Sequence, residues 1–272
     1  VVRTKPQVQD PLPLTQFVDR LQESGRYTFT REEAVTECGI SEIALRQAAL
    51  RLQKQNRLVS PRRGFFVIVP LEYRSAGAPP PAWYIDALMR FHGRPYYVGL
   101  LSAAALHGAA HQQAQEFQVI ADRAPRPVIA GRTQPRFFHK RRQAQTPTVA
   151  MKVETGTMLV SSPEATALDL VRYPLAAGGL GNIVTVLAEL AEKIDPERLV
   201  EAAASEAELA AVQRVGLLLE FAGAGEKVDH LAEWIANRKP RTIRLRPDRD
   251  VAGAPKNQRW RLLVNERFEV EE

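Results

Sequence analysis

The sequence predicts an α+β fold in two parts: a small helical module ending in a hairpin, and a larger domain of mixed helices and strands. Three observations predict it. The 272 residues exceed one typical domain of roughly 100 to 200 residues. Hydrophobic residues make up 45% and charged residues 25%, which is typical of a globular protein. Helical and alternating apolar patterns occupy both sides of a proline-rich run at residues 74–82.

Two short helices are predicted near the amino terminus. Thr30 followed by Glu33 has the spacing of a capping box and starts the second helix, which Gly39 ends. A short β-prone stretch, residues 27–29, precedes it. Gly25 ends the first helix, whose apolar residues recur at steps of three and four: Leu14, Phe17, Val18 and Leu21.

A third helix and a hairpin complete the module. Ser41 caps the helix, which runs to about Asn56 and carries one apolar stripe: Leu45, Ala48, Ala49 and Leu52. Strands at residues 58–60 and 65–69 flank the basic turn PRRG, residues 61–64. Three helices followed by a hairpin with a basic tip predict a winged helix-turn-helix over residues 1–75.

This module is predicted to bind double-stranded DNA. A helix with arginine and glutamine on its outer face fits the major groove, and a basic hairpin tip reaches a phosphate or the minor groove. The alternative to DNA binding is that the same three-helix fold contacts another protein. We expect binding through residues 41–63, a range that starts at Ser41. Base contacts are expected from Arg46, Gln47 and Arg51, and phosphate contacts from Lys54, Arg57, Arg62 and Arg63.

Residues 76–82 are predicted to link this module to a larger domain at residues 83–272. The run RSAGAPPPA combines small residues with three prolines, which favour an extended chain. Beyond it, helices are expected at residues 83–91, 100–107, 162–171, within 183–221, and at 228–237. Strands are expected at residues 117–121, 136–138, 156–160 and 259–264.

The net charge of +6 indicates a polyanionic partner, and its distribution is uneven. Residues 1–75 hold 12 basic and 8 acidic side chains. Residues 123–152 hold 8 basic side chains and no acidic one, and residues 238–261 hold 9 basic and 2 acidic side chains. Between them, residues 154–237 hold 5 basic and 14 acidic side chains. The chain therefore alternates between basic and acidic blocks.

The first basic block of the larger domain predicts a second nucleic-acid surface, for DNA beside the first site or for RNA. Its cations are interleaved with the aromatic residues 137–139, as in single-strand binding sites. The alternative is that the same residues form one solvent-exposed edge strand, in which the arginines discourage aggregation. The candidate residues are Arg132, Arg136, Lys140, Arg141 and Arg142.

Several classes of protein do not fit the sequence. No apolar run approaches the roughly 20 residues of a membrane-spanning helix, so we expect no membrane partner. The start of the chain has no apolar core of a signal peptide, and Cys38 is the single cysteine. We therefore expect a cytoplasmic protein, with Cys38 packed in the interior.

Two motifs resemble catalytic or metal sites only in part. His107 and His111 have the spacing of a helical zinc pair, but Gly108 is expected to end the helix between them. A metal-dependent nuclease would need Asp122 and Glu154, yet Lys152 precedes Glu154 instead of following it. A cleavage assay with magnesium or manganese would expose that alternative.

Two further candidates have structural explanations. Ser161, Ser162 and Asp169 are typical of a helix start and an exposed helical carboxylate, without a nucleophile elbow. The glycines at 178–181 lack the strand and lysine of a phosphate loop, and are expected to form a turn before a helix at Ile183. We expect no catalytic residue, no cofactor and no metal.

The chain also resembles the AbiEi antitoxins. The resemblance rests on the second domain: YYVGLLSAAALHG at 96–108, SSPEATALDLV at 161–171, LGNIVTVLAELAEKIDPERLVEAA at 180–203, QRVGLLLE at 213–220 and the closing NQRWRLLVNERFEVE. With the winged helix, it covers nearly the whole chain. It implies an antitoxin of a bacterial type IV toxin–antitoxin system, linked to abortive phage infection, that represses its own operon.

The same resemblance implies that the carboxy-terminal domain counters a nucleotidyltransferase-like toxin without a stable complex. A repressor with no toxin partner is the alternative, and the neighbouring gene would discriminate between the two.

Overall fold

The chain forms two compact units in a computed structural model that describes residues 11–109, 116–123, 131, 134–206 and 208–266. The first unit comprises Val1–Arg94, Pro125–Arg136 and Met151–Met158, and the second comprises Pro95–Ala124, Phe137–Ala150 and Leu159–Glu272. Helices and strands are mixed, which confirms the predicted α+β class. No helix in the described residues is long and apolar enough to cross a membrane.

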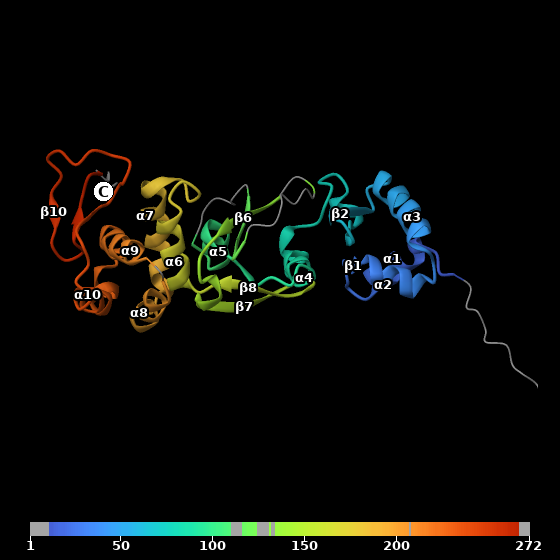
Figure 1. Ribbon diagram of the computed structural model, residues 1–272, viewed down its shortest axis with the longest axis horizontal. Coiled ribbons are helices and arrows are strands. Elements are labelled where there is room, and N and C mark those ends of the chain that lie inside the picture. Colours follow the sequence, from blue (N-terminus) through green and yellow to red (C-terminus); the bar gives the residue numbers. More distant parts are fainter. Residues whose placement is uncertain (1–10, 110–115, 124–130, 132–133, 207, 267–272) are drawn as a thin grey trace, which may run out of the picture. The chain divides into compact units, whose positions relative to one another are not determined.

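The first unit begins with three helices, α1 (Leu14–Glu23), α2 (Arg31–Cys38) and α3 (Glu42–Lys54) (Figure 1). The predicted caps are present: the Thr30 hydroxyl accepts from the Glu33 amide, and the Ser41 hydroxyl accepts from the Ala44 amide. Gly39 has φ +62°, a left-handed conformation that lets the chain turn from α2 into α3. Local sequence therefore fixes where both helices begin.

A three-stranded antiparallel sheet completes the winged helix. It consists of β1 (Thr28–Thr30), β2 (Leu58–Arg62) and β3 (Phe65–Ile68), in the order β1-β3-β2. The hairpin turn uses Gly64, whose φ is +85°. Helices and sheet share one hydrophobic core, in which the rings of Phe17, Phe29 and Phe66 pack together. The winged helix-turn-helix predicted from the sequence is confirmed.

The proline-rich run packs against this module instead of standing free. Ala78 and Pro81 are buried, and the run leads into α4 (Ile85–Phe91). The ring of Trp83 lies 4.8 Å from that of Tyr27, measured between centroids. Residues up to Arg94 therefore group with the winged helix. This grouping does not test the functional borders at residues 75 and 83, which stay a prediction.

A five-stranded sheet has the order β6-β5-β4-β8-β7. Two of its three inner strands, β4 (Tyr96–Val98) and β5 (Phe117–Ala121), lie wholly in the second unit. Strand β4 runs antiparallel to β5 and parallel to β8. The other strands are β6 (Pro135–His139), β7 (Thr148–Val153) and β8 (Gly156–Ser161). The sequence patterns predicted β5, β6 and β8 but missed β4 and β7.

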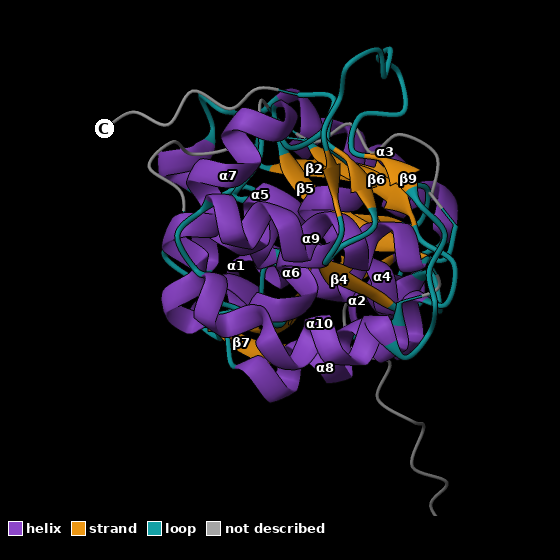
Figure 2. Ribbon diagram, turned by 90° about the vertical axis from the view of Figure 1, so that its left-hand side faces the viewer, coloured by secondary structure: helices purple, strands orange, loops and turns teal. Residues whose placement is uncertain are grey.

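Helices make up most of the second unit (Figures 1 and 2). Ser162 caps α6 with Pro163 in its first turn, as predicted, and its hydroxyl accepts from the Ala165 amide. The glycine run belongs to a helix that starts at Gly179, four residues earlier than expected. The helices are α5 (Leu100–Leu106), α6 (Pro163–Arg172), α7 (Gly179–Leu190), α8 (Pro196–Ser205), α9 (Leu209–Phe221) and α10 (Asp229–Ala236).

The end of the described chain is held by a buried tryptophan. A strand was expected over residues 259–264, but only β11 (Leu262–Leu263) forms, between β9 (Ile243–Arg244) and β10 (Lys256–Asn257). Trp260 is fully buried against Gly216 of α9. The Gln213 side-chain amide donates to the Trp260 carbonyl oxygen at 2.9 Å. Packing on α9 thus replaces most of the expected strand.

Gly216 is predicted to be indispensable for this packing. A Cβ atom there would lie 2.2 Å from the Trp260 ring. Gly216→Ala should lower the free energy of unfolding by about 1–3 kcal/mol, because the ring must be displaced. Gly181→Ala in α7 is the matched control, since a Cβ there meets nothing within 4 Å. It should raise stability by about 0.5–1 kcal/mol. Urea unfolding measures both, and equal effects would contradict the prediction.

Candidate nucleic-acid interface

Helix α3 presents one continuous exposed face. Leu45, Ala49 and Leu52 are buried in the core of the winged helix. Residues three, four and seven apart share a face of a helix, so the opposite side forms a single stripe. The stripe consists of Ile43, Gln47, Leu50 and Lys54, all exposed. It is the surface that a winged helix directs into a major groove.

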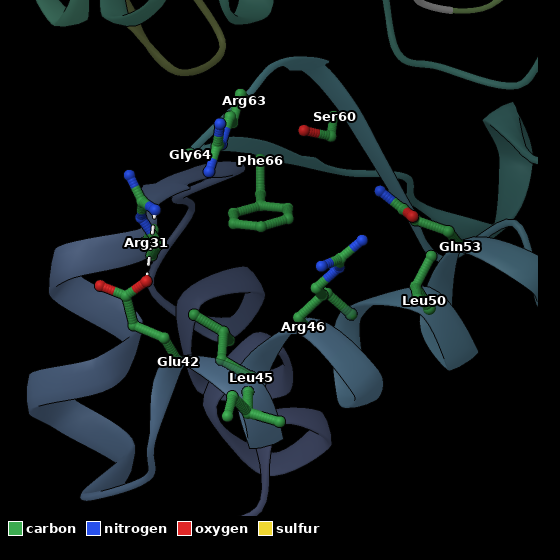
Figure 3. A pocket seen from close by; sticks show the side chains of 12 residues that line it. Arg31, Glu42, Leu45, Arg46, Leu50, Gln53, Ser60, Arg63, Gly64 and Phe66 are labelled. Atoms are coloured by element: carbon green, nitrogen blue, oxygen red, sulfur yellow. Dashed lines mark hydrogen bonds and ion pairs between the residues drawn. The ribbon is translucent and has the colours of Figure 1, made fainter.

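A groove of about 660 Å³ separates one flank of α3 from the hairpin (Figure 3). Figure 3 shows Arg46 rising from α3 into this groove toward Ser60, and Arg63 at its rim. The ring of Phe66 lies in the groove between helix and hairpin. Arg46 and Arg63, both predicted DNA contacts, are therefore brought together on the hairpin side of the helix.

Arg51 lies on the other flank of α3. It lines a separate hollow with Gln55 and the chain at residues 11–15. Five helical steps place Arg51 about 140° around the helix from Arg46. The predicted base-contacting set of Arg46, Gln47 and Arg51 is thus spread across the exposed side, with Gln47 between the two arginines and closer to Arg51.

Arg31 is a residue of this surface that the sequence patterns missed. Its backbone amide donates to the Gly64 carbonyl oxygen at 2.8 Å, which ties the start of α2 to the hairpin turn. Its guanidinium lies 3.4 Å from the Glu42 carboxylate and 3.2 Å from that of Glu32. Arg31 therefore positions the hairpin and offsets the negative charge of Glu42 in the first turn of α3. Its place directly after the cap residue Thr30 was the available signal.

The remaining candidates differ in how accessible they are. Lys54 and Arg63 are exposed, and Arg62 is half-buried. The Arg57 guanidinium lies 2.5 Å from the Asp19 carboxylate of α1, and the Ser41 hydroxyl is engaged as a helix cap. Their roles in DNA binding stay predictions.

A histidine lies near the turn of the hairpin. Burial lowers the pKa of His92, and the positive charges of Arg62 and Arg94 lower it further. Its ring packs against Phe91, whose own ring contacts Phe65 of β3. A neutral imidazole is favoured here because a third cation would be repelled.

The proposed second surface loses one of its members. Lys140 is only 3% exposed, so its place on a nucleic-acid surface was wrong. Its ammonium lies 2.7 Å from Asp169 Oδ1 and 3.0 Å from Glu206 Oε2, which are charges of the protein itself. Arg136, Arg141 and Arg142 are exposed, whereas Arg132 lies outside the described residues.

The buried lysine belongs to a network of charged and polar groups in the second unit. Asp169, expected to be exposed, is fully buried and accepts a hydrogen bond from the Tyr97 hydroxyl at 2.9 Å. Arg172 joins Glu206 to Glu208 through contacts of 2.8 Å and 2.9 Å. Burial works to lower the pKa of Lys140, but the two carboxylates outweigh it and raise that pKa. The ammonium is therefore charged at neutral pH.

The other sequence candidates for chemistry have structural roles or stay untested. His107 follows the last turn of α5, and its Nε2 lies 2.7 Å from the Ser161 carbonyl oxygen. Its expected partner, His111, lies outside the described residues. Cys38 is buried, as expected. In the part of the chain that the structure describes, no three His, Cys, Asp or Glu residues are grouped to hold a metal ion.

The carboxy-terminal basic block is partly neutralised by acidic neighbours. Arg246 pairs with Asp248 and Glu266, and Arg249 also pairs with Glu266. Arg259 contacts both Glu220 of α9 and Asp229 of α10. Three of the nine basic residues of the block are therefore engaged in ion pairs within the second unit.

The helix order, hairpin and exposed face of α3 place the first unit in the winged helix-turn-helix class, attached here to a larger helical unit. Comparison with protein families agrees. A family model described as a transcriptional regulator, AbiEi antitoxin, matches residues 16–69, and the AbiEi antitoxin C-terminal domain matches residues 97–221. The chain belongs to the AbiEi antitoxin family. It is an antitoxin of the kind that carries a transcriptional-regulator domain.

A solved structure has the same fold over nearly the whole chain. The RV2827C protein from Mycobacterium tuberculosis is similar with a TM-score of 0.66 and 17% sequence identity, over 94% of each chain. At this identity the likeness concerns the fold alone. No curated protein sequence matches the chain.

The burial of Lys140 predicts a large loss of stability when it is replaced. Lys140→Met should lower the free energy of unfolding by about 3–5 kcal/mol, because Asp169 and Glu206 lose their shared cation. Arg141→Met, one residue further on and exposed, is the control and should stay within about 0.5 kcal/mol. Thermal and urea unfolding of the full chain measure both. Equal stability of the two variants would argue that Lys140 is a surface residue.

Proposed function

We propose that this antitoxin represses its own operon by binding inverted repeats in promoter DNA through its winged helix. The exposed face of α3, flanked on both sides by arginines, carries the proposal. Side chains on the central stripe reach base edges when the helix lies in a major groove. Because they lie on the flanks of that stripe, we assign Arg46 and Arg51, expected from the sequence to contact bases, to the phosphate backbones together with Arg63.

We further propose a division of labour along the chain. Residues 1–75 read the operator, residues 76–82 link the parts, and residues 83–272 counter a nucleotidyltransferase-like toxin without forming a stable complex with it. The family matches support this division, since one ends at residue 69 and the other begins at residue 97. With operator DNA as its partner, the protein acts in the cytoplasm, and it acts without catalysing a reaction.

The central test removes one side of the proposed interface. A variant combining Arg46→Ala, Gln47→Ala and Arg63→Ala should bind its promoter fragment at least about tenfold more weakly. The slope of log affinity against log salt should also fall by about two, because each of the two arginines neutralises one phosphate. Electrophoretic retardation across a salt series measures both quantities.

Arg20→Ala is the matched control for that test. Arg20 is an exposed arginine of α1 that lies outside the stripe and the hairpin, so its removal changes the charge but not the interface. Its affinity and salt slope should stay near those of the original chain. Normal promoter binding by the triple variant, with its fold intact, would overturn the proposed DNA reader.

The second basic surface is tested separately. We expect the combination of Arg136→Ala, Arg141→Ala and Arg142→Ala to weaken rescue of cells from the toxin encoded beside the antitoxin. Operator affinity should change little, because the operator is read by α3. The comparison uses growth with both proteins expressed from independent promoters, alongside promoter retardation.

Other results for this variant would change the role assigned to the three arginines. If the variant instead binds the operator more weakly and with a smaller salt slope, the three arginines contact DNA that flanks the operator. Unchanged rescue, affinity and salt slope would dispose of a second nucleic-acid surface, whether for DNA or RNA.

A further inference from the structure

The recognition stripe of α3 contains two large aliphatic side chains exposed to solvent. Ile43 is 73% exposed and Leu50 is 49% exposed. Single exposed apolar residues are ordinary, but these two lie on the same face of one helix. Gln47 lies between them on that face. The centre of the proposed DNA-reading surface is therefore apolar, with one amide.

Among the charged residues of this surface, Lys54 lies at one end of the stripe and the arginines lie beside it. Arg46, Arg63 and Arg31 line the groove on the hairpin side, which Ile43 and Leu50 also line, and Arg51 lies on the opposite flank. Glu42 is the acidic residue that lines the same groove, and it is paired with Arg31. An apolar strip between cationic flanks suits a polyanion that carries apolar groups between its charges. It does not suit an uncharged apolar protein surface.

Duplex DNA presents one such apolar group in its major groove, the C5-methyl group of thymine. Ile43 and Leu50 are seven residues apart, which is about 10.5 Å along the helix. Successive base pairs are about 3.4 Å apart along the duplex, so the two side chains span about three base pairs. A glutamine between them has the geometry to bond the N6 and N7 atoms of adenine.

We propose that Ile43 and Leu50 read thymine methyl groups, and that Gln47 between them reads adenine. Sequence recognition then centres on a run of A·T pairs in each half-site, while the arginines supply phosphate contacts. The proposal rests on the proposed DNA-binding function and specifies which bases that function selects.

Replacement of thymine by deoxyuridine tests this directly, because it removes the methyl group and keeps every hydrogen-bonding atom. The binding site is first enriched from a random duplex library with the full-length protein, and then synthesised with either base. Loss of one buried methyl group weakens binding about fourfold. The deoxyuridine site should therefore bind about fourfold more weakly for each methyl group that is read.

The protein variants complete a double-mutant cycle with the DNA. Ile43→Ala combined with Leu50→Ala should bind thymine and deoxyuridine sites with nearly equal affinity, because the partner of the methyl group is gone. Leu71→Ala is the matched control, since Leu71 is 72% exposed in the same unit but lies outside α3. It should keep the full preference for thymine. Thermal unfolding checks that each variant is folded.

The possible outcomes separate this inference from the function on which it rests. If the original chain enriches no duplex and binds none above background, the DNA-binding function itself fails. If it binds thymine and deoxyuridine sites equally, the methyl reading fails while the regulator stands. If the double variant keeps both affinity and thymine preference, Ile43 and Leu50 do not contact the bases and the proposal is overturned.

Discussion

The burial of Leu45, Ala49 and Leu52 against the core of the winged helix determines what the rest of α3 can do. Once these three residues face inward, the stripe from Ile43 to Lys54 has to face solvent, because both sets follow the same helical period. The hairpin is then held beside it by the bond from the Arg31 amide to the Gly64 carbonyl oxygen. One apolar contact and one backbone bond thus orient both parts of the candidate interface.

In the second unit the corresponding constraint is electrostatic. Lys140, Asp169 and Glu206 are all buried, and burying any one of these charges without the others would cost folding free energy. The cluster joins the end of β6 to α6 and to the residue after α8, segments far apart in the chain. A buried ion pair adds little stability compared with apolar packing, but it disfavours arrangements that leave a charge unpaired. Its role is therefore to specify which segments meet.

The sequence predicted the elements whose signals are local. Thr30, Ser41 and Ser162 start helices at the expected positions, because a capping hydroxyl needs only an amide three residues away. Strand β4 was missed because its three residues become a strand only through pairing with β5 and β8. The packing of the proline-rich run was missed as well, because the contact of Trp83 with Tyr27 joins residues 56 positions apart.

The residues of the candidate site were predictable where their signal is local, as the helix starts were. The helical period already identifies Gln47 as exposed. Ile43 and Leu50 follow the same period, but the sequence patterns did not single them out, and their exposure comes from the structure. The role of Lys140 could not be predicted, because a basic run next to aromatic residues looks the same whether its lysine faces solvent or two buried carboxylates. Asp169 within the apolar run ALDLV was the available signal, since a carboxylate there needs a buried cation.

Net charge is therefore a poor guide to the proposed nucleic-acid interface of this protein. Three of the nine basic residues in the carboxy-terminal block, Arg246, Arg249 and Arg259, are paired with acidic side chains of the fold. The winged helix has a smaller excess of positive charge, but it places its arginines beside an apolar stripe. Phosphate contacts alone cannot distinguish one DNA sequence from another. Selectivity requires groups that meet the bases, and in the proposed interface the groups of α3 that do so are one amide and two aliphatic side chains.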